Sequence, residues 1–248
     1  IAPAEILIAD NFSHSAIDDA KCPKKRLAPW QFDLDSAKQS LTKQFNAYDL
    51  DGYGCADLSA AIAAAGALLD YVKHTQRSTL PHIAGLSVEQ ASSFIQLDAA
   101  TRRNLEIDQT LRGETSPTLF SLLDSTQTAM GARLLRRWLH HPLRSRSEIV
   151  ARHEAIHSLI QRATYPAIRN LLRSIGDIER ITARIALKTA RPRDLSGLRE
   201  SLRQLPALQT ELKNLPASLL QALTTELQAP QAAVDLLQSA IKVEPAAV

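Results

Sequence analysis

Residues 97–143 decide the fold of this chain, and they read LDAATRRNLEI, then DQTLRGET, then SPTLFSLLDSTQTAMGARLLRRWLHHPL. Asp98 or Thr101 can cap a short helix near the start of the stretch. The pair Ser116-Pro117 is typical of a second helix start, because the hydroxyl can accept a backbone hydrogen bond and proline needs no N–H partner. Thr128 can cap a third helix. The stretch therefore predicts three consecutive helices.

The third of these helices has two different faces. Its apolar residues recur at helical spacing, as expected for a side that packs on a core. They are Met130, Leu134, Leu135, Trp138 and Leu139. The opposite face is basic, with Arg133, Arg136, Arg137 and His140. His140 and His141 come at the helix end, where the helix dipole favours positive charge, and Pro142 stops the helix.

Beyond residue 143 the apolar residues keep helical spacing. Prolines stand just before several leucine-bearing runs, where each can begin a helix. They are Pro166, Pro192, Pro206, Pro216 and Pro230. Buried faces are expected at Ile149, Ile156 and Ile160, at Ile178, Ile181 and Ile185 behind the cap Asp177, and at Leu195, Leu198, Leu202 and Leu205. Because no fixed sequence period is found, we expect a packed array of short antiparallel helices and no solenoid.

The first 90 residues have a mixed pattern that is typical of an α/β segment. A short apolar run and a run of alternating apolar and polar residues predict two strands, and two Leu- and Ala-bearing runs predict two helices. The remainder reads as loops and as a connection to the helical part. The predicted order is a strand at 5–9, a basic loop at 21–26, a strand at 30–34, a helix capped by Asp35 or Ser36, a turn at 51–54, a helix at 58–73, a connection at 74–90 and an extended entry at 94–97.

Three motifs in the deciding stretch strongly resemble the start of the core (lever) domain of the MutS family of bacterial DNA mismatch-recognition proteins. They are DAATRRNLEI at 98–107, TLFSLLD at 118–124 and MGARLLRRWL at 130–139. The resemblance implies an α+β chain. The C-terminal part of a ribonuclease-H-like α/β connector domain, with its linker, would occupy residues 1–90. The first part of an all-α, multi-helix core domain would occupy residues 91–248.

The resemblance also implies a function. Such a piece would be structural and signal-transmitting, and would link contacts with a mismatch and with the DNA clamp to a distant ATPase domain. The full-length family is a DNA-dependent ATPase that uses ATP and Mg and forms homodimers in the cytoplasm, associated with the nucleoid during repair. Its implied partners are mismatched duplex DNA and a MutL-type protein that docks on the connector domain.

Composition agrees with a helical chain that has its own core. Hydrophobic residues make up 45% and charged residues 22%, whereas aromatic residues are only 4%, a balance that favours helix over sheet. The formal net charge of +3 is weak evidence for a nucleic-acid partner. We expect Cys22 and Cys55 to be free thiols, and no apolar run is long enough for a membrane span. Because no Met precedes Ile1, we expect a piece of a longer protein.

One sequence matches a catalytic metal motif. His153-Glu154-Ala155-Ile156-His157 fits H-E-x-x-H, in which two histidines one helical turn apart bind zinc and the glutamate polarises a water. Glu179 could be a third ligand. The competing interpretation, which we prefer, is an accidental match on a solvent-facing helix surface beside a side buried through Ile156 and Ile160. A zinc hydrolase and a freestanding helical adaptor therefore remain the two alternative functions.

Charged residues offer two further candidates. The arginines between 133 and 203 outnumber the acids and could bind phosphate, but we expect them to lie in solvent or to pair with acids, since no glycine or aromatic residue interleaves with them. Those acids are Glu148, Glu154, Asp177, Glu179, Asp194 and Glu200. We expect Arg102 and Arg103 to form an internal ion-pair cluster with Asp98 and Glu106, and Arg191, Arg193 and Asp194 to serve a helix start.

Six aspartates of the α/β segment could in principle hold a metal, as acids of a ribonuclease-H-like sheet can. Their irregular spacing favours caps and turns instead. They are Asp18, Asp19, Asp33, Asp35, Asp49 and Asp51. The sequence contains no G-x-x-x-x-G-K-[ST], G-x-G-x-x-G or G-x-S-x-G. We therefore expect no catalytic, cofactor-binding or metal-binding residue in this chain, and the family's ATP site would lie outside it.

Overall fold

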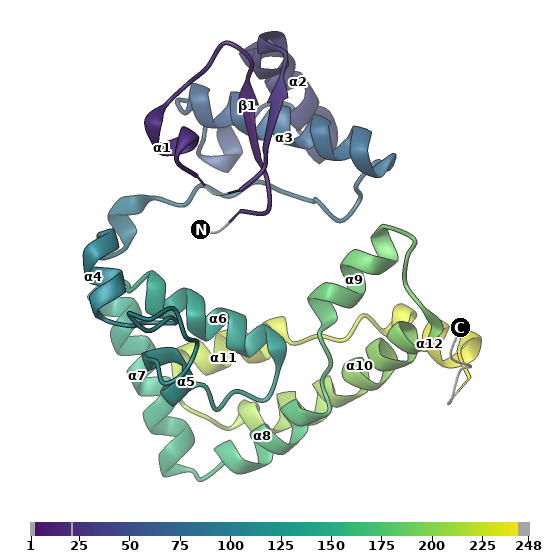
Figure 1. Ribbon diagram of the computed structural model, residues 1–248. Helices are drawn as coiled ribbons and strands as arrows, with labels where there is room; N and C mark the ends of the chain where they lie inside the picture. The colour runs from purple at the N-terminus through teal and green to yellow at the C-terminus, as the bar shows by residue number, and fades with distance from the viewer. Residues whose placement is uncertain (1–2, 21, 243–248) are drawn as a thin grey trace. The chain divides into compact units, whose positions relative to one another are not determined.

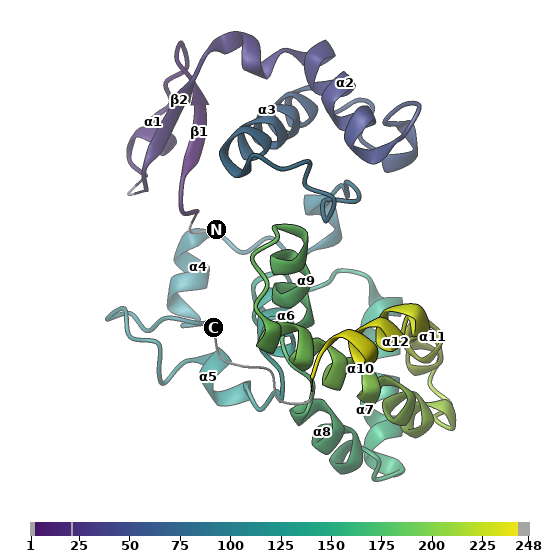
Figure 2. The ribbon, with the colours of Figure 1, turned by 90° about the vertical axis from the view of Figure 1, so that its right-hand side faces the viewer.

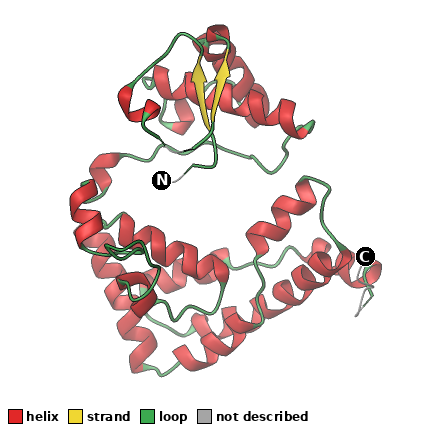
Figure 3. Cartoon of the chain, viewed as in Figure 1, coloured by secondary structure: helices red, strands yellow, loops and turns green. Residues whose placement is uncertain are grey.

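The computed structural model describes residues 3–20 and 22–242. The chain divides into two compact units, Ile1–Val88 (unit 1) and Glu89–Val248 (unit 2). Figure 3 shows one pair of strands in unit 1 and helices with loops in unit 2.

Unit 1 begins with a two-stranded parallel sheet. Strand β1 (Ile6–Ala9) pairs with β2 (Lys24–Leu27) in the register Ile6 to Lys24 through Ala9 to Leu27, and the short helix α1 (Ser15–Asp18) lies in the connection. The strand predicted at 5–9 is therefore confirmed. The basic loop predicted at 21–26 is wrong from Lys24 onward, because backbone pairing with β1 makes this charged segment a strand. Lys21 lies outside the described residues.

Two helices complete unit 1. The strand predicted at 30–34 is wrong. Pro29–Phe32 forms a 3₁₀ helix (η1), and Trp30 is 74% exposed. Helix α2 (Leu34–Phe45) is capped by Asp33 in place of Asp35 or Ser36, and Asp51–Tyr53 forms the second 3₁₀ helix, η2. Helix α3 (Ser59–Gln76) packs along α2, as Figure 2 shows. Their contact is so close that Gly66 of α3 lies directly against Ala37 of α2.

The Gln44 side chain of α2 is hydrogen-bonded to the segment after α3. The Gln44 amide nitrogen donates to the carbonyl oxygens of Thr79, Leu80 and Ile83 at 3.0–3.2 Å. Leu80 is fully buried and adopts a left-handed φ of 53°. The first part of the connection predicted at 74–90 is therefore packed structure that belongs to unit 1.

Unit 2 is helical, as predicted. A 3₁₀ turn, η3 (Ala91–Ser93), leads into α4 (Ala99–Asn104), α5 (Leu119–Leu123) and α6 (Ala129–His140), which cover the deciding stretch. Asp98 and Thr128 cap α4 and α6, which confirms two predicted caps. The cap of α5 is Thr118, two residues beyond the predicted Ser116. The remaining helices are α7 (Arg146–Gln161), α8 (Tyr165–Arg173), α9 (Ile178–Ala186), α10 (Pro192–Lys213), α11 (Ser218–Glu226) and α12 (Gln231–Ala240).

Helix α10 is the long axis of unit 2 and packs against α8, α9, α11 and α12 (Figure 1). Its 22 residues span about 33 Å at 1.5 Å per residue. Pro166 and Pro192 stand in the first turns of α8 and α10, as predicted. Pro206 does not begin a helix and lies inside α10. Its predicted role is wrong because the leucines on both sides of it pack as parts of one continuous helix.

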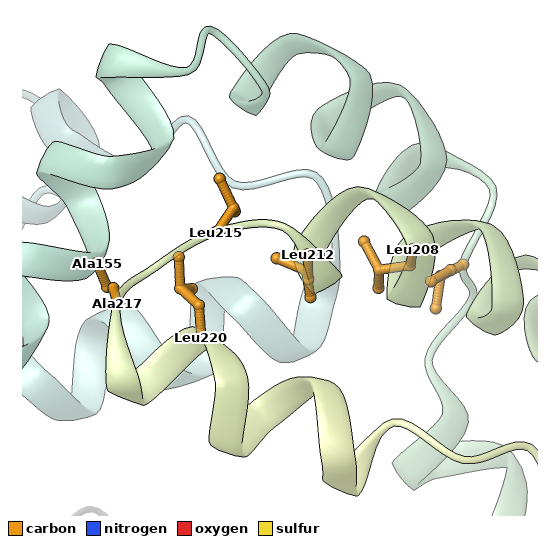
Figure 4. Packing of buried hydrophobic residues seen from close by; sticks show 7 residues of the cluster. Ala155, Leu208, Leu212, Leu215, Ala217 and Leu220 are labelled. Carbon is orange, nitrogen blue, oxygen red and sulfur yellow. The ribbon is translucent and has the colours of Figure 1, made fainter.

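Two apolar clusters form the core of unit 2, and α10 contributes to both. The larger one joins α7, α10 and α11 with the loops between them (Figure 4), and its members are Ala155, Ile175, Leu208, Leu212, Leu215, Ala217 and Leu220. The smaller one joins α9, α10 and α12 and contains Ile181, Leu198, Leu202 and Val234. The predicted faces of α9 and α10 are thus largely confirmed, although Ile185 is 39% exposed.

The predicted apolar faces of α6 and α7 need correction. Met130 of α6 packs on the larger cluster, but Leu134 and Trp138 remain 48% and 40% exposed. On α7 the buried positions are those of Ala155 and Ser158, whereas Ile156 and Ile160, expected inside, are 53% and 61% exposed. Because α11 packs along the side of α7 that bears Ala155, the two isoleucines lie on the outer side.

Candidate functional site: the ion-paired helix α6

The basic face of α6 forms ion pairs with several other segments of unit 2. At the start of the helix, Arg133 forms a bidentate pair with Asp177, with both N–O distances at 2.8 Å, and also contacts Glu179. Asp177 is at the same time the N-cap of α9, where it accepts a hydrogen bond from the Arg180 amide. One carboxylate therefore caps α9 and joins it to α6.

The pairing shifts the pKa values of both partners in the directions expected from their charges. Hydrogen bonds from Arg133 hold the pKa of Asp177 below its ordinary value, and the Arg180 amide adds to this effect. Hydrogen bonds to Asp177 and Glu179 raise the pKa of Arg133. Bidentate, charge-assisted pairs fix geometry more strongly than single contacts do. The Arg133 side chain is 50% exposed, so solvent screens the pair. The pair therefore contributes more to the orientation of α9 against α6 than to the stability of the fold.

The end of α6 is fastened to the start of unit 2. Arg137 pairs with Glu89 at 3.2 Å, and the Ile95 amide donates to the Pro142 carbonyl at 2.8 Å. Phe94 and Leu143 form an isolated antiparallel bridge. The extended entry predicted at 94–97 is therefore in part a single-bridge pairing with the segment that follows α6.

Two cation–ring contacts and an aspartate–histidine pair occupy the rest of α6. The Arg136 guanidinium lies 4.5 Å from the centre of the Phe120 ring, and Arg152 of α7 lies 3.7 Å from the centre of Trp138. Arg152 thus covers an aromatic ring that the sequence placed in the core. His140 Nε2 lies 3.0 Å from Asp108, while its buried Nδ1 has no hydrogen-bond partner among the described residues.

The expectation that the arginines pair with acids is confirmed for several of them. In addition to Arg133, Arg184 pairs with Asp194 at 2.7 Å, and Arg199 and Arg203 both contact Glu200. Asp194 also accepts a hydrogen bond from the Arg191 amide at the start of α10, as predicted, and this bond lowers its pKa.

Two of the acids proposed as partners behave differently. In the part of the chain that the structure describes, Glu148 and Glu154 form no ion pair within 4.0 Å. Arg199 was expected in solvent or on an acid, but it is 4% exposed and also donates to the carbonyl oxygens of Ile241 and Lys242. No local sequence signal distinguishes this buried arginine from its exposed neighbours.

The expected ion-pair cluster at Arg102 and Arg103 is wrong. Asp98 caps α4 by accepting from the Thr101 amide, which lowers the pKa of Asp98. Glu106 accepts from the Leu111 amide at 2.7 Å. Backbone donors thus occupy both acids, and Arg102 donates to the Leu97 carbonyl.

The H-E-x-x-H residues lie on the outer side of α7. His153, Glu154 and His157 are all exposed, and the suggested third ligand, Glu179, is bonded to Arg133. Throughout residues 3–20 and 22–242, no three His, Cys, Asp or Glu side chains are placed to hold a metal ion together. The arrangement at α6 joins helices through charge pairs.

The aspartates of unit 1 include caps and turns, as predicted. Asp33 caps α2 by accepting from the Ser36 amide, and Asp49 accepts from the Asp51 amide. The Ser36 bond lowers the pKa of Asp33.

Cys22 and Cys55 are free, and Cys55 is buried. As far as the structure is described, no helix combines the length and apolar character that crossing a membrane requires.

Comparison with known families agrees with this architecture. Residues 1–84, within unit 1, match the family model of MutS domain II, the connector domain. Residues 100–248, within unit 2, match the family model of MutS domain III, the core domain. These domains are non-catalytic parts of an ATPase family. The chain therefore belongs to the MutS family of DNA mismatch repair proteins and carries its domains II and III.

Proposed function

We propose that unit 2 transmits conformational change between the DNA-contacting parts and the ATPase domain of a MutS protein. The observation that carries the proposal is that one helix, α10, supplies residues to both apolar clusters. Leu198 and Leu202 lie in the smaller cluster, and Leu208 and Leu212 lie in the larger one. A displacement of α12 or α9 would therefore act on α10, the same helix that packs with α7 and α11 in the larger cluster.

Because of this packing, moving a cluster as a rigid body costs less free energy than bending a helix within it. Protein interiors are close-packed, so a helix that bends within a cluster opens voids, whereas a cluster that moves as a unit opens none. Truncating one buried leucine to alanine typically costs about 2–5 kcal/mol. Shifts of packed helices at interfaces are a common form of switching.

The test uses a full-length protein that contains these domains. Leu208→Ala, in the larger cluster, should reduce the stimulation of ATP hydrolysis by mismatched duplex DNA several-fold and leave the basal rate unchanged. Leu236→Ala is the control, because Leu236 on α12 is 65% exposed. Leu208→Met keeps the side-chain volume and should retain most of the stimulation. Unchanged stimulation in a folded Leu208→Ala protein would exclude transmission through this cluster.

We propose further that ATP and Mg bind to other parts of the family's proteins and that unit 1 docks a MutL-type partner. Two exposed aromatic residues support the docking proposal, since Trp30 and Tyr48 are 74% and 100% exposed and such residues are enriched at binding hot spots. Tyr48→Ala should weaken capture of purified MutL by the full-length protein, whereas the exposed Leu236→Ala of unit 2 should not. Equal capture by both variants would contradict the proposed surface.

We also propose that the sheet of unit 1 is part of the ribonuclease-H-like sheet that the resemblance implies. Strand β1 is wholly apolar, which is typical of an interior strand of a parallel sheet. Strand β2 carries Lys24, Lys25 and Arg26, and such charges are typical of an edge strand.

A further inference from the structure

A hollow of about 350 Å³ lies beside α4 and is rich in positive charge. Its walls come from the last turns of α4 and α6 and from the loop that leads on to α5, a loop that Figure 2 shows after α4. The charged and polar residues among its lining are Arg102, Arg103, Asp108, Gln109, Thr110 and His140.

In the part of the chain that the structure describes, the two arginines of this hollow are not paired with a carboxylate. Among the described residues, no carboxylate oxygen lies within 4.0 Å of either guanidinium group. The two acids nearest in sequence are held elsewhere, Asp98 by the Thr101 amide and Glu106 by the Leu111 amide. Two positive charges therefore line one hollow, and neither has an ion pair of its own among the described residues.

The orientation of Arg102 is partly fixed. Its Nε donates to the Leu97 carbonyl at 3.0 Å, which leaves the two terminal nitrogens of the planar fork for another acceptor. The one acid that lines the hollow, Asp108, lies 3.0 Å from His140 Nε2 and 3.9 Å from the Arg136 guanidinium. Its negative charge is thus partly compensated and opposes an incoming anion less than a free carboxylate would.

The backbone at Gly113 leaves room for a ligand to come close to it. Gly113, which also lines the hollow, has a left-handed φ of 85°, and no atom lies within 4 Å of the position that a Cβ would take. Arginine forks match the geometry of phosphate oxygens and bind them bidentately. We propose that Arg102 and Arg103 bind a phosphate group in this hollow, supplied either by a free phosphate compound or by a nucleic-acid backbone. This proposal does not depend on the transmission proposed above.

The test compares Arg103→Gln with Arg112→Gln. Both substitutions remove one positive charge from the same region, but Arg112 does not line the hollow. Calorimetric titration with inorganic phosphate and with pyrophosphate should show saturable binding that Arg103→Gln weakens ~10-fold, as expected for the loss of a charge-assisted hydrogen bond. Arg112→Gln should bind as the unchanged chain does. Arg103→Lys keeps the charge but not the fork, and should fall between the two.

A short DNA duplex, titrated by fluorescence anisotropy at several salt concentrations, identifies the source of the phosphate. If the backbone of nucleic acid is the ligand, Arg103→Gln weakens duplex binding far more than Arg112→Gln does. If only the small phosphates bind, the source is a free compound. The proposal is overturned if no probe binds saturably, or if both variants weaken every probe equally, since the arginines would then only complement the end of α4 and the overall charge.

Discussion

Gly66→Ala should loosen unit 1, although the same change stabilises most helices. An ideal Cβ at Gly66 would lie 2.4 Å from the Ala37 Cβ and 2.6 Å from the Ala37 Cα. Carbon atoms in ordinary contact are ~3.5–4.0 Å apart, so α2 and α3 would have to separate by more than about 1 Å. Overpacking of this kind costs up to ~3 kcal/mol. Alanine gains about 1 kcal/mol of helix propensity over glycine, which leaves a net loss of about 2 kcal/mol.

Native-state hydrogen exchange, read by mass spectrometry, measures this loss locally. Peptides from α2 and α3 should lose protection in Gly66→Ala, whereas peptides from α10 in unit 2 serve as an internal control. Gly52→Ala is the matched variant, because nothing lies within 4 Å of its Cβ position. Adding Ala37→Gly to Gly66→Ala should restore part of the protection by removing the closer of the two contacts. A gain of about 1 kcal/mol in Gly66→Ala would refute the close helix contact.

Three further predictions follow from unit 2. Because the folded-state pKa of Asp177 is lowered, its pair with Arg133 should stabilise unit 2 above the ordinary carboxyl pKa of 3.8 and lose that effect as the pH falls through the lower folded value. In an acid titration followed by circular dichroism, Asp177→Asn should therefore show a smaller pH-dependent loss of stability than the unchanged chain. Ser201→Val should destabilise unit 2 by about 1–3 kcal/mol in urea unfolding, since the fully buried hydroxyl links the Gly176 amide to the Gly197 carbonyl, and Ser196→Val should cost less because Ser196 is only partly buried. Elemental analysis after dialysis against zinc should find no stoichiometric zinc on the His-Glu-Ala-Ile-His sequence of α7, and zinc that remains bound in a 1:1 ratio would contradict this prediction.

Local chemistry predicted many helix starts because a cap acts within three residues. Asp98, Thr128 and Asp177 each accept from a backbone amide three residues ahead, and each was expected to begin a helix. The caps of α2 and α5 were misplaced because several hydroxyl or carboxyl residues compete there, and only the backbone angles select Asp33 and Thr118.

Features that depend on distant partners could not be predicted from the sequence. Strand β2 carries three charged residues, so no apolar alternation marks it, and only its pairing with β1 makes it a strand. The set of acids that would meet the arginines was partly predictable, but the individual pairs were not. Arg133 and Asp177 lie 44 residues apart, and no periodicity joins them. Ile156 and Ile160 were assigned to the core because apolar spacing defines a face without saying which face is covered.

Pro206 shows how a failed local rule locates a tertiary constraint. A proline inside a helix cannot donate to the carbonyl four residues earlier, that of Leu202, and costs about 3 kcal/mol or more. Helix α10 nevertheless runs through it, because two buried leucines before it and two after it are held in different clusters. Full burial of one leucine is worth about 1.5–3 kcal/mol, so four leucines outweigh the proline. If α10 broke at this residue, the two clusters could move independently, and a displacement at α9 or α12 would not reach α7. The continuity of α10 across Pro206 is therefore the feature on which the transmission that we propose for unit 2 depends.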